Sequence, residues 1–234
     1  MKTAFYPLLN SLISNIAIVF CFAPFFMALW KKLHYERAYI LIGLYWLITA
    51  LLNQYNWISN AQNNHLQAQL MFIRNLIGAH FVLVIFLFCA EGPQKKIIFY
   101  SLLSFILFEL LMIIWNGVDN ASNIVIIGLG SLLVMIFSIA GLVRYFKEME
   151  HSSFENAMAF VYAAFLFAYG GTTMIYILNY LNVATTNDPD EFFLYYVGLL
   201  LSSLLTCYGL WEYAGKPSKQ PFQMKAKHKL NSSY

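Results

Sequence analysis

Seven long apolar runs constrain this chain more than any other feature of its sequence. Each is long enough to cross the ~30 Å hydrocarbon core of a bilayer as an α-helix that rises ~1.5 Å per residue. The runs fall at residues 7–30, 38–58, 68–90, 97–116, 122–145, 156–183 and 192–213. Short polar links separate them, so consecutive helices are expected to be antiparallel and mostly adjacent. The sequence therefore predicts an all-α integral membrane protein, a bundle of seven transmembrane helices.

The composition supports membrane insertion and argues against other classes of protein. Hydrophobic residues make up 60% of the chain and charged residues 11%, which is too few polar groups to cover a soluble domain. No basic surface with interleaved aromatic side chains precedes the final residues, so nucleic acid is not an expected partner. Cys21, Cys89 and Cys207 lie in apolar runs without metal-ligand spacing and are expected to be core residues.

The basic residues predict how the bundle sits in the membrane. Twelve of the fourteen lysines and arginines fall on the side of the odd-to-even links and the tail. They are Lys31, Lys32, Arg37, Lys95, Lys96, Arg144, Lys147, Lys216, Lys219, Lys225, Lys227 and Lys229. The opposite side holds Lys2, Arg74 and the acidic link 188–191. By the positive-inside rule the amino terminus is expected outside and the carboxyl terminus in the cytoplasm.

The two ends of the chain have different characters. The first apolar run is too long for the apolar part of a signal peptide and lacks an evident cleavage site, so we interpret it as the first helix. Residues 1–216 are predicted to form the transmembrane domain. Residues 217–234 are polar and basic, and we expect a disordered cytoplasmic tail whose lysines meet anionic headgroups.

Two charged residues are predicted within the hydrocarbon, where each costs ~2.5–3.5 kcal/mol on insertion scales. Arg74 and Glu109 lie at depths that differ by only ~5 Å when counted along their helices. A long arginine side chain bridges that distance, so the two residues are a candidate pair. The alternative is that Arg74 extends to the outer headgroups while Glu109 is protonated or hydrogen-bonded locally.

Further polar residues share this outer depth. They are Asn15, Asn53, Gln54, Asn75, Asn116, Asn179, Tyr195 and Tyr196. If their faces converge, they line a polar cavity that opens outward. Hydrogen bonds between helices explain the same amides without any cavity, and the sequence leaves both interpretations open.

His80 is the only histidine expected within a membrane helix. It is a candidate proton relay, but one histidine without other ligands favours a hydrogen-bonded core residue over a metal site. The sequence also lacks His-Glu-x-x-His, Gly-x-Ser-x-Gly and any intramembrane pair of aspartates. Neither a bound metal nor enzymatic activity is therefore predicted.

Several local segments resemble the microbial (type 1) rhodopsins, in particular the proton-pumping branch of bacteria. Phe72-Ile73-Arg74 resembles the family's third helix, and Lys95-Lys96 followed by Ser101-Leu102 resembles the start of its fourth. Ser153-Phe154 and Phe167-Ala168-Tyr169 resemble the sixth helix, with Gly170 where a proline is usual. The last helix aligns without a gap from Leu194-Tyr195 through Gly209-Leu210-Trp211 to Ala214. The resemblance implies a bacterial inner membrane location.

The departures from that family remove its photochemistry. Ser203 occupies the position of the retinal lysine, and Leu199 that of the aspartate one turn before it. Ile77 replaces the counterion of the third helix, and Phe88 falls near the usual proton donor. Every lysine lies in a link or a terminus, so covalent retinal is not expected.

The resemblance implies a rhodopsin-like protein without covalent retinal, which acts as a binding, sensory or accessory protein. Arg74, Asn75, His80, Glu109, Tyr169 and Ser203 are the candidate pocket or pathway residues. The expected partners are the bilayer and a second copy or another membrane protein, and non-covalent retinal or a carotenoid is a candidate ligand. The alternative function is transport of a small solute or protons through the outer polar residues. The chain is also similar to SWEET-type sugar transporters at Asn75-Leu-Ile-Gly78, but it lacks that family's prolines and second asparagine.

Overall fold

A computed structural model describes residues 2–59, 64–117, 120–180 and 189–214, and within these ranges the side chains of several helix ends are not described. All regular structure in these ranges is helical. The helices are α1 (Lys2–Cys21), α2 (Ala23–Trp30), α3 (Arg37–Ser59), α4 (Asn64–Cys89), α5 (Pro93–Asn116), α6 (Asn120–Lys147), α7 (Ser153–Tyr180) and α8 (Pro189–Ala214), with a short 3₁₀ helix η1 at Leu33–Tyr35. The predicted all-α class is confirmed for the described part of the chain. The described part of each predicted apolar run falls on one helix, except that the first run, residues 7–30, covers both α1 and α2.

The first apolar run bends because of one proline. Pro24 has no backbone N–H to donate to the preceding turn, and its ring opposes continuation of a straight helix. α1 accordingly ends at Cys21, the N–H of Phe22 bonds the carbonyl of Val19 at 3.2 Å, and α2 begins at Ala23. Ser11–Trp30 still forms one apolar segment of membrane-spanning length.

Local signals also determine where other helices begin and end. Pro93 occupies the first turn of α5 directly after Gly92, whose φ of 61° favours glycine. α7 begins with a reciprocal cap in which the Glu155 N–H bonds Ser152 Oγ at 3.2 Å and the Ser152 N–H bonds Glu155 Oε2 at 2.7 Å. These caps fix the ends of the helices that carry the site.

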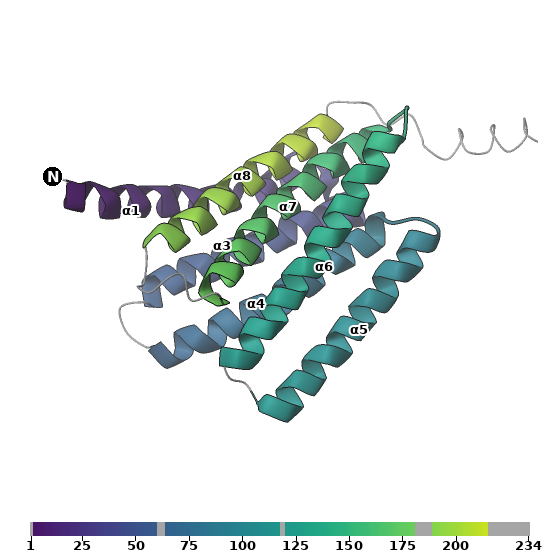
Figure 1. The fold of residues 1–234 in the computed structure, drawn as a ribbon. Coiled ribbons are helices and arrows are strands. Elements are labelled where there is room, and N and C mark those ends of the chain that lie inside the picture. The colour runs from purple at the N-terminus through teal and green to yellow at the C-terminus, as the bar shows by residue number, and fades with distance from the viewer. Residues whose placement is uncertain (1, 60–63, 118–119, 181–188, 215–234) are drawn as a thin grey trace, which may run out of the picture.

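The helices pack in two layers. α6, α7 and α8 lie side by side, and α3 and α4 lie behind them (Figure 1). α1 packs against α8, while α2 packs against α3 and α8. α5 lies at one edge of the bundle, where it packs against α4 and α6. This arrangement brings α3, α4, α6, α7 and α8 around one interior.

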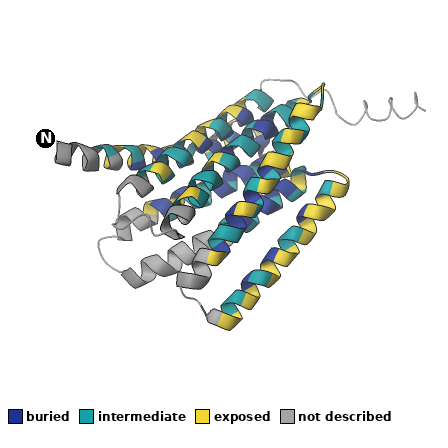
Figure 2. Ribbon diagram, in the orientation of Figure 1, coloured by how far each residue is buried: buried dark blue, intermediate teal, exposed yellow. Residues whose placement is uncertain are grey.

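The interior is apolar and rich in aromatic side chains, including fully buried Trp46, Phe86 and Phe165. The outer surfaces are also apolar. Figure 2 shows this best on α5, whose outward side is exposed along much of its length and carries Leu107 and Ile114. Such surfaces are suited to lipid tails rather than to water.

Five of the described segments are long and apolar enough to cross a membrane. They are Ser11–Trp30, Pro93–Trp115, Val125–Lys147, Ser153–Ile175 and Phe193–Tyr213. The described apolar part of α4, Ile77–Cys89, is shorter. The chain thus has the helices of an integral membrane protein. The predicted tail at 217–234 lies outside the described residues.

Candidate functional site

A cleft of about 90 Å³ lies between five helices, near the middle of α3 and α4 and in the first halves of α6 and α8. Its walls are mainly apolar and include Ile48 and Leu52 of α3, Phe81 of α4 and Ile126 of α6. The cleft is partly open. Since none of its lining residues is aspartate, glutamate, lysine, arginine or histidine, an uncharged molecule suits it best.

Three tyrosines are among the polar residues that line the cleft, beside Thr49, Ser131 and Thr172. Tyr45 of α3, Tyr169 of α7 and Tyr195 of α8 all line it. Tyr45 Oη donates to Tyr169 Oη at 3.4 Å, and Tyr195 Oη donates to Asn53 Oδ1 at 3.3 Å. Both distances are long for O–H···O bonds, so a better-placed polar group would compete for these hydroxyls at little cost.

A glycine lets one of these hydroxyls reach the opposite helix. A Cβ atom at Gly78 of α4 would lie 3.3 Å from Tyr169 Oη, closer than ordinary van der Waals contact. The tyrosine therefore extends from α7 across the cleft to the backbone of α4. Thr173 holds the backbone below it, since its hydroxyl donates to the Tyr169 carbonyl at 2.9 Å.

The cleft gathers several positions that the rhodopsin resemblance singled out. Ile77 and Leu199, which replace two of that family's carboxylates, both line it together with Tyr169. Ser203 does not line it. This serine is fully buried one helical turn further along α8, where its hydroxyl donates to the Leu200 carbonyl at 2.8 Å. Phe88 is about half exposed on the outside of the bundle.

A second polar feature joins α4 to α5. His80 Nε2 lies 2.9 Å from Glu109 Oε2, and the Glu109 side chain is only 5% exposed. The contact has the distance of an ion pair but not the alignment of a good hydrogen bond, and Glu109 Oε1 has no hydrogen-bond partner among the described groups. The His80 ring stacks on Phe105, with centroids 4.9 Å apart and planes at 25°. Ionisable residues within membrane helices are rare and mark candidate proton pathways, so the pair is a second candidate site.

The remaining predicted residues are only partly within the described structure. Arg74 and Asn75 lie in α4, but their side chains are outside the described residues, so the predicted pair of Arg74 and Glu109 stays a prediction. The contact between His80 and Glu109 was missed because residue counting ignores helix tilt and rotation. Among the outer polar residues, Asn53 is buried and meets Tyr195, whereas Asn15 and Gln54 are exposed.

Comparison with known proteins adds no relatives. No protein-family model, no curated protein and no solved structure matches the chain. The resemblance to rhodopsins therefore remains a prediction from the quoted segments. Function must be argued from the cleft and from the pair of His80 and Glu109.

Proposed function

We propose that this chain is a seven-helix, rhodopsin-like membrane protein that binds a small uncharged molecule non-covalently, as a binding or sensory protein. The observation that carries the proposal is the cleft, whose lining combines three tyrosines from three helices with mainly apolar side chains and contains no carboxylate or amine. Few polar groups in a mainly apolar pocket are typical of small-molecule sites. Ser203 supports non-covalent binding because its hydroxyl cannot form the Schiff base of a lysine.

The size of the cleft narrows the class of ligand. At about 90 Å³ it is smaller than the ~150 Å³ cavity that accepts benzene in an engineered protein. Because the cleft is partly open, a molecule with one small ring or a short chain can place its hydroxyl or carbonyl end inside and leave the rest at the opening. Retinal or a carotenoid would place one end in the cleft and leave most of its polyene outside.

The proposed topology places the cleft nearer the outer side of the membrane. Seven spans with the amino terminus outside place the first residues of α4, α6 and α8 at the outer surface of a bacterial inner membrane. The cleft lies in the first halves of α6 and α8, so its ligand would arrive from outside the cell or from the outer leaflet. The excess of lysine and arginine at the opposite end supports this orientation.

Binding of a simple probe tests the proposal. Phenol offers one ring and one hydroxyl, whereas benzene offers the ring alone. We expect phenol to raise the unfolding temperature of the detergent-solubilised protein more than benzene does, because a ligand specific for the folded state stabilises it by mass action. Isothermal titration with phenol measures the same binding directly.

Two substitutions on α7 make the test specific to the cleft. Ala168→Leu adds bulk to a lining residue and should abolish the phenol effect, whereas Met174→Leu alters an exposed residue of the same helix and should retain it. Equal phenol responses in both variants and the wild type would refute binding in the cleft. Partition of phenol into detergent is common to all three proteins and cancels in the comparison.

The pair of His80 and Glu109 favours a second candidate function, proton transfer across the membrane. The two ionisable side chains lie 2.9 Å apart inside the bundle, and neighbouring ionisable groups within membrane helices are typical of proton relays. Proteoliposomes with an internal pH indicator measure such a flux. Flux should fall in Glu109→Gln and in His80→Gln, and it should persist in Arg74→Ala if Arg74 only contacts headgroups. A flux that is unchanged in both of the first two variants would remove this candidate.

A further inference from the structure

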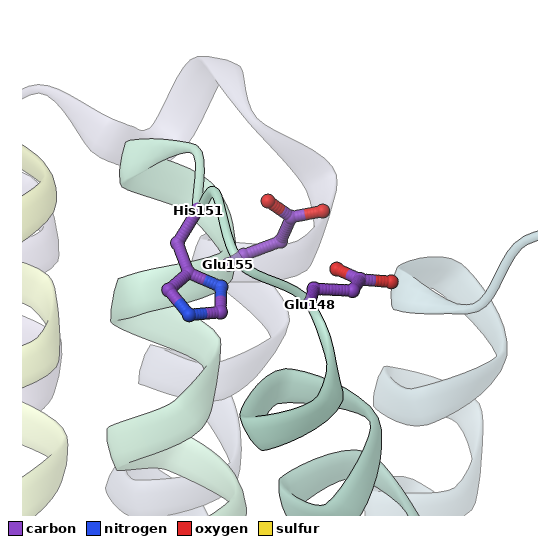
Figure 3. A group of neighbouring side chains, drawn as sticks. All are labelled: Glu148, His151 and Glu155. Atoms are coloured by element: carbon purple, nitrogen blue, oxygen red, sulfur yellow. The ribbon is translucent and has the colours of Figure 1, made fainter.

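The link between α6 and α7 brings together three side chains that can bind a metal. Glu148 follows the last residue of α6, His151 lies in the link, and Glu155 lies in the first turn of α7. One ligand atom from each lies within 4.8 Å of the others. Figure 3 shows a ring nitrogen of His151 directed toward the side of the link on which the two carboxylates lie.

Each of the three side chains retains an atom that the local structure does not use. The helix cap uses Glu155 Oε2, which accepts the Ser152 N–H. An ion pair uses Glu148 Oε1, which accepts Arg144 Nε–H at 2.9 Å. His151 Nδ1 is buried and has no hydrogen-bond partner among the described groups. The second oxygen of each carboxylate and this nitrogen therefore remain for a ligand.

The orientation of the histidine ring is fixed by its neighbour. The rings of His151 and Tyr145 stack with centroids 3.9 Å apart and planes at 21°. Tyr145 is itself held by its hydroxyl, which donates to Asn156 Oδ1 at 2.9 Å. A buried nitrogen without a partner costs free energy, and the stacking opposes rotation of the ring to satisfy it. A cation at this position would remove that cost.

The charge around the link also favours a cation. Glu148 and Glu155 line a hollow of about 80 Å³ together with Glu91, and Arg144 is the only basic residue among its lining residues. Three carboxylates against one guanidinium leave two negative charges there. A divalent ion would neutralise them.

We propose that Glu148, His151 and Glu155 form a binding site for a divalent first-row transition metal ion such as Zn²⁺ or Mn²⁺. The imidazole favours these ions over Ca²⁺ and Mg²⁺, whose ligands are almost entirely oxygen. Three protein ligands leave further coordination positions for water, and small rotations of the partly buried glutamates bring the ligands to bonding distance. Bound metal would tie the end of α6 to the start of α7.

Metal binding by the purified full-length protein tests the proposal. The protein in detergent is freed of metal with EDTA and then dialysed against increasing Zn²⁺, and bound metal is counted by mass spectrometry. Mn²⁺ titration followed by electron paramagnetic resonance reports the same site. We expect one high-affinity ion per chain, and a loss of roughly tenfold or more in affinity for His151→Ala and for Glu148→Gln, since each removes a ligand. Neither substitution removes the pair of hydrogen bonds that caps α7.

Matched controls separate the site from other binding groups. Glu150→Gln changes an exposed glutamate of the same link, and His228→Ala removes a histidine of the tail. Both variants should bind like the wild type. Arg144→Gln should bind more tightly, because it removes a competing cation and frees Glu148 Oε1. Wild-type affinity in His151→Ala, or an equal loss in Glu150→Gln, would overturn the proposal.

Discussion

The pair of His80 and Glu109 predicts strong energetic coupling between α4 and α5. His80→Leu would leave Glu109, which is 5% exposed, without the group that balances its charge, and Glu109→Leu would do the same to His80. Breaking a buried ion pair on one side costs ~3–5 kcal/mol, whereas replacing both partners by apolar residues is often nearly neutral. Each single variant should therefore be less stable by ~3 kcal/mol or more, and the double variant should recover most of that loss.

Unfolding in mixed micelles measures this coupling. The fraction of sodium dodecyl sulfate is raised stepwise while the fluorescence of the five tryptophans is followed. The wild type, both single variants and the double variant form a cycle whose interaction free energy should be about 5 kcal/mol, because two single losses of ~3 kcal/mol each are nearly absent from the double variant. Glu109→Gln keeps a polar group beside His80 and should cost less than Glu109→Leu. Additivity within ~0.5 kcal/mol, as for independent sites, would refute the coupling.

Three further substitutions test the local geometry by the same unfolding assay. Ser152→Ala removes the cap shared with Glu155 and should cost ~1 kcal/mol, whereas equal stability would show that the cap contributes nothing. Gly130→Val would place a Cβ atom 2.9 Å from Phe105 Cζ and should cost ~1–3 kcal/mol; an unchanged midpoint would mean that α5 and α6 separate freely. Lys32 has a φ of 56°, so Lys32→Gly should stabilise the link before η1 by up to ~1 kcal/mol, and a loss of stability would contradict this reading of the strain.

The helices were predictable because apolar runs of spanning length have few other folds available to them. Even the break between α1 and α2 has a sequence signal in Pro24, although the apolar run alone predicts one helix over residues 7–30. The buried positions of α5 are also predictable, because they follow the spacing of one face of an α-helix. Its inward residues Ile98, Phe105 and Glu109 recur at helical spacing, with Leu102 and Met112 completing the stripe.

The partners within the bundle were less predictable than the helices. Counting residues placed Arg74 and Glu109 at similar depth, but the described partner of Glu109 is His80, six residues further along α4 than Arg74. Depth along a helix says nothing of its rotation, and six residues turn an α-helix by about 240°. Ser203 lies outside the cleft for a different reason, since it shares a helix face with Leu199 but lies one turn further along α8, beyond the end of the cleft.

The three candidate metal ligands were within reach of sequence reasoning. Glu148, His151 and Glu155 follow one another within eight residues, a spacing that a search for ligands in links would have noted. The membrane histidine His80, by contrast, has no second histidine within the predicted helices to complete a metal site. What the sequence does not contain is the folded link itself, which brings both carboxylates and the imidazole to one side.

Because α5 lies at the edge of the bundle, Glu109 also has a structural role in orienting this helix. Lipid tails solvate an apolar helix about as well as leucine side chains do, so a peripheral helix gains little by choosing one rotation over another. The contact between Glu109 and His80 makes one rotation of α5 lower in free energy than the others. A shift of one residue along the helix would turn Glu109 by about 100° toward hydrocarbon, where its carboxylate would be costly. This one polar contact therefore selects the rotation and axial position of α5 against the rest of the bundle.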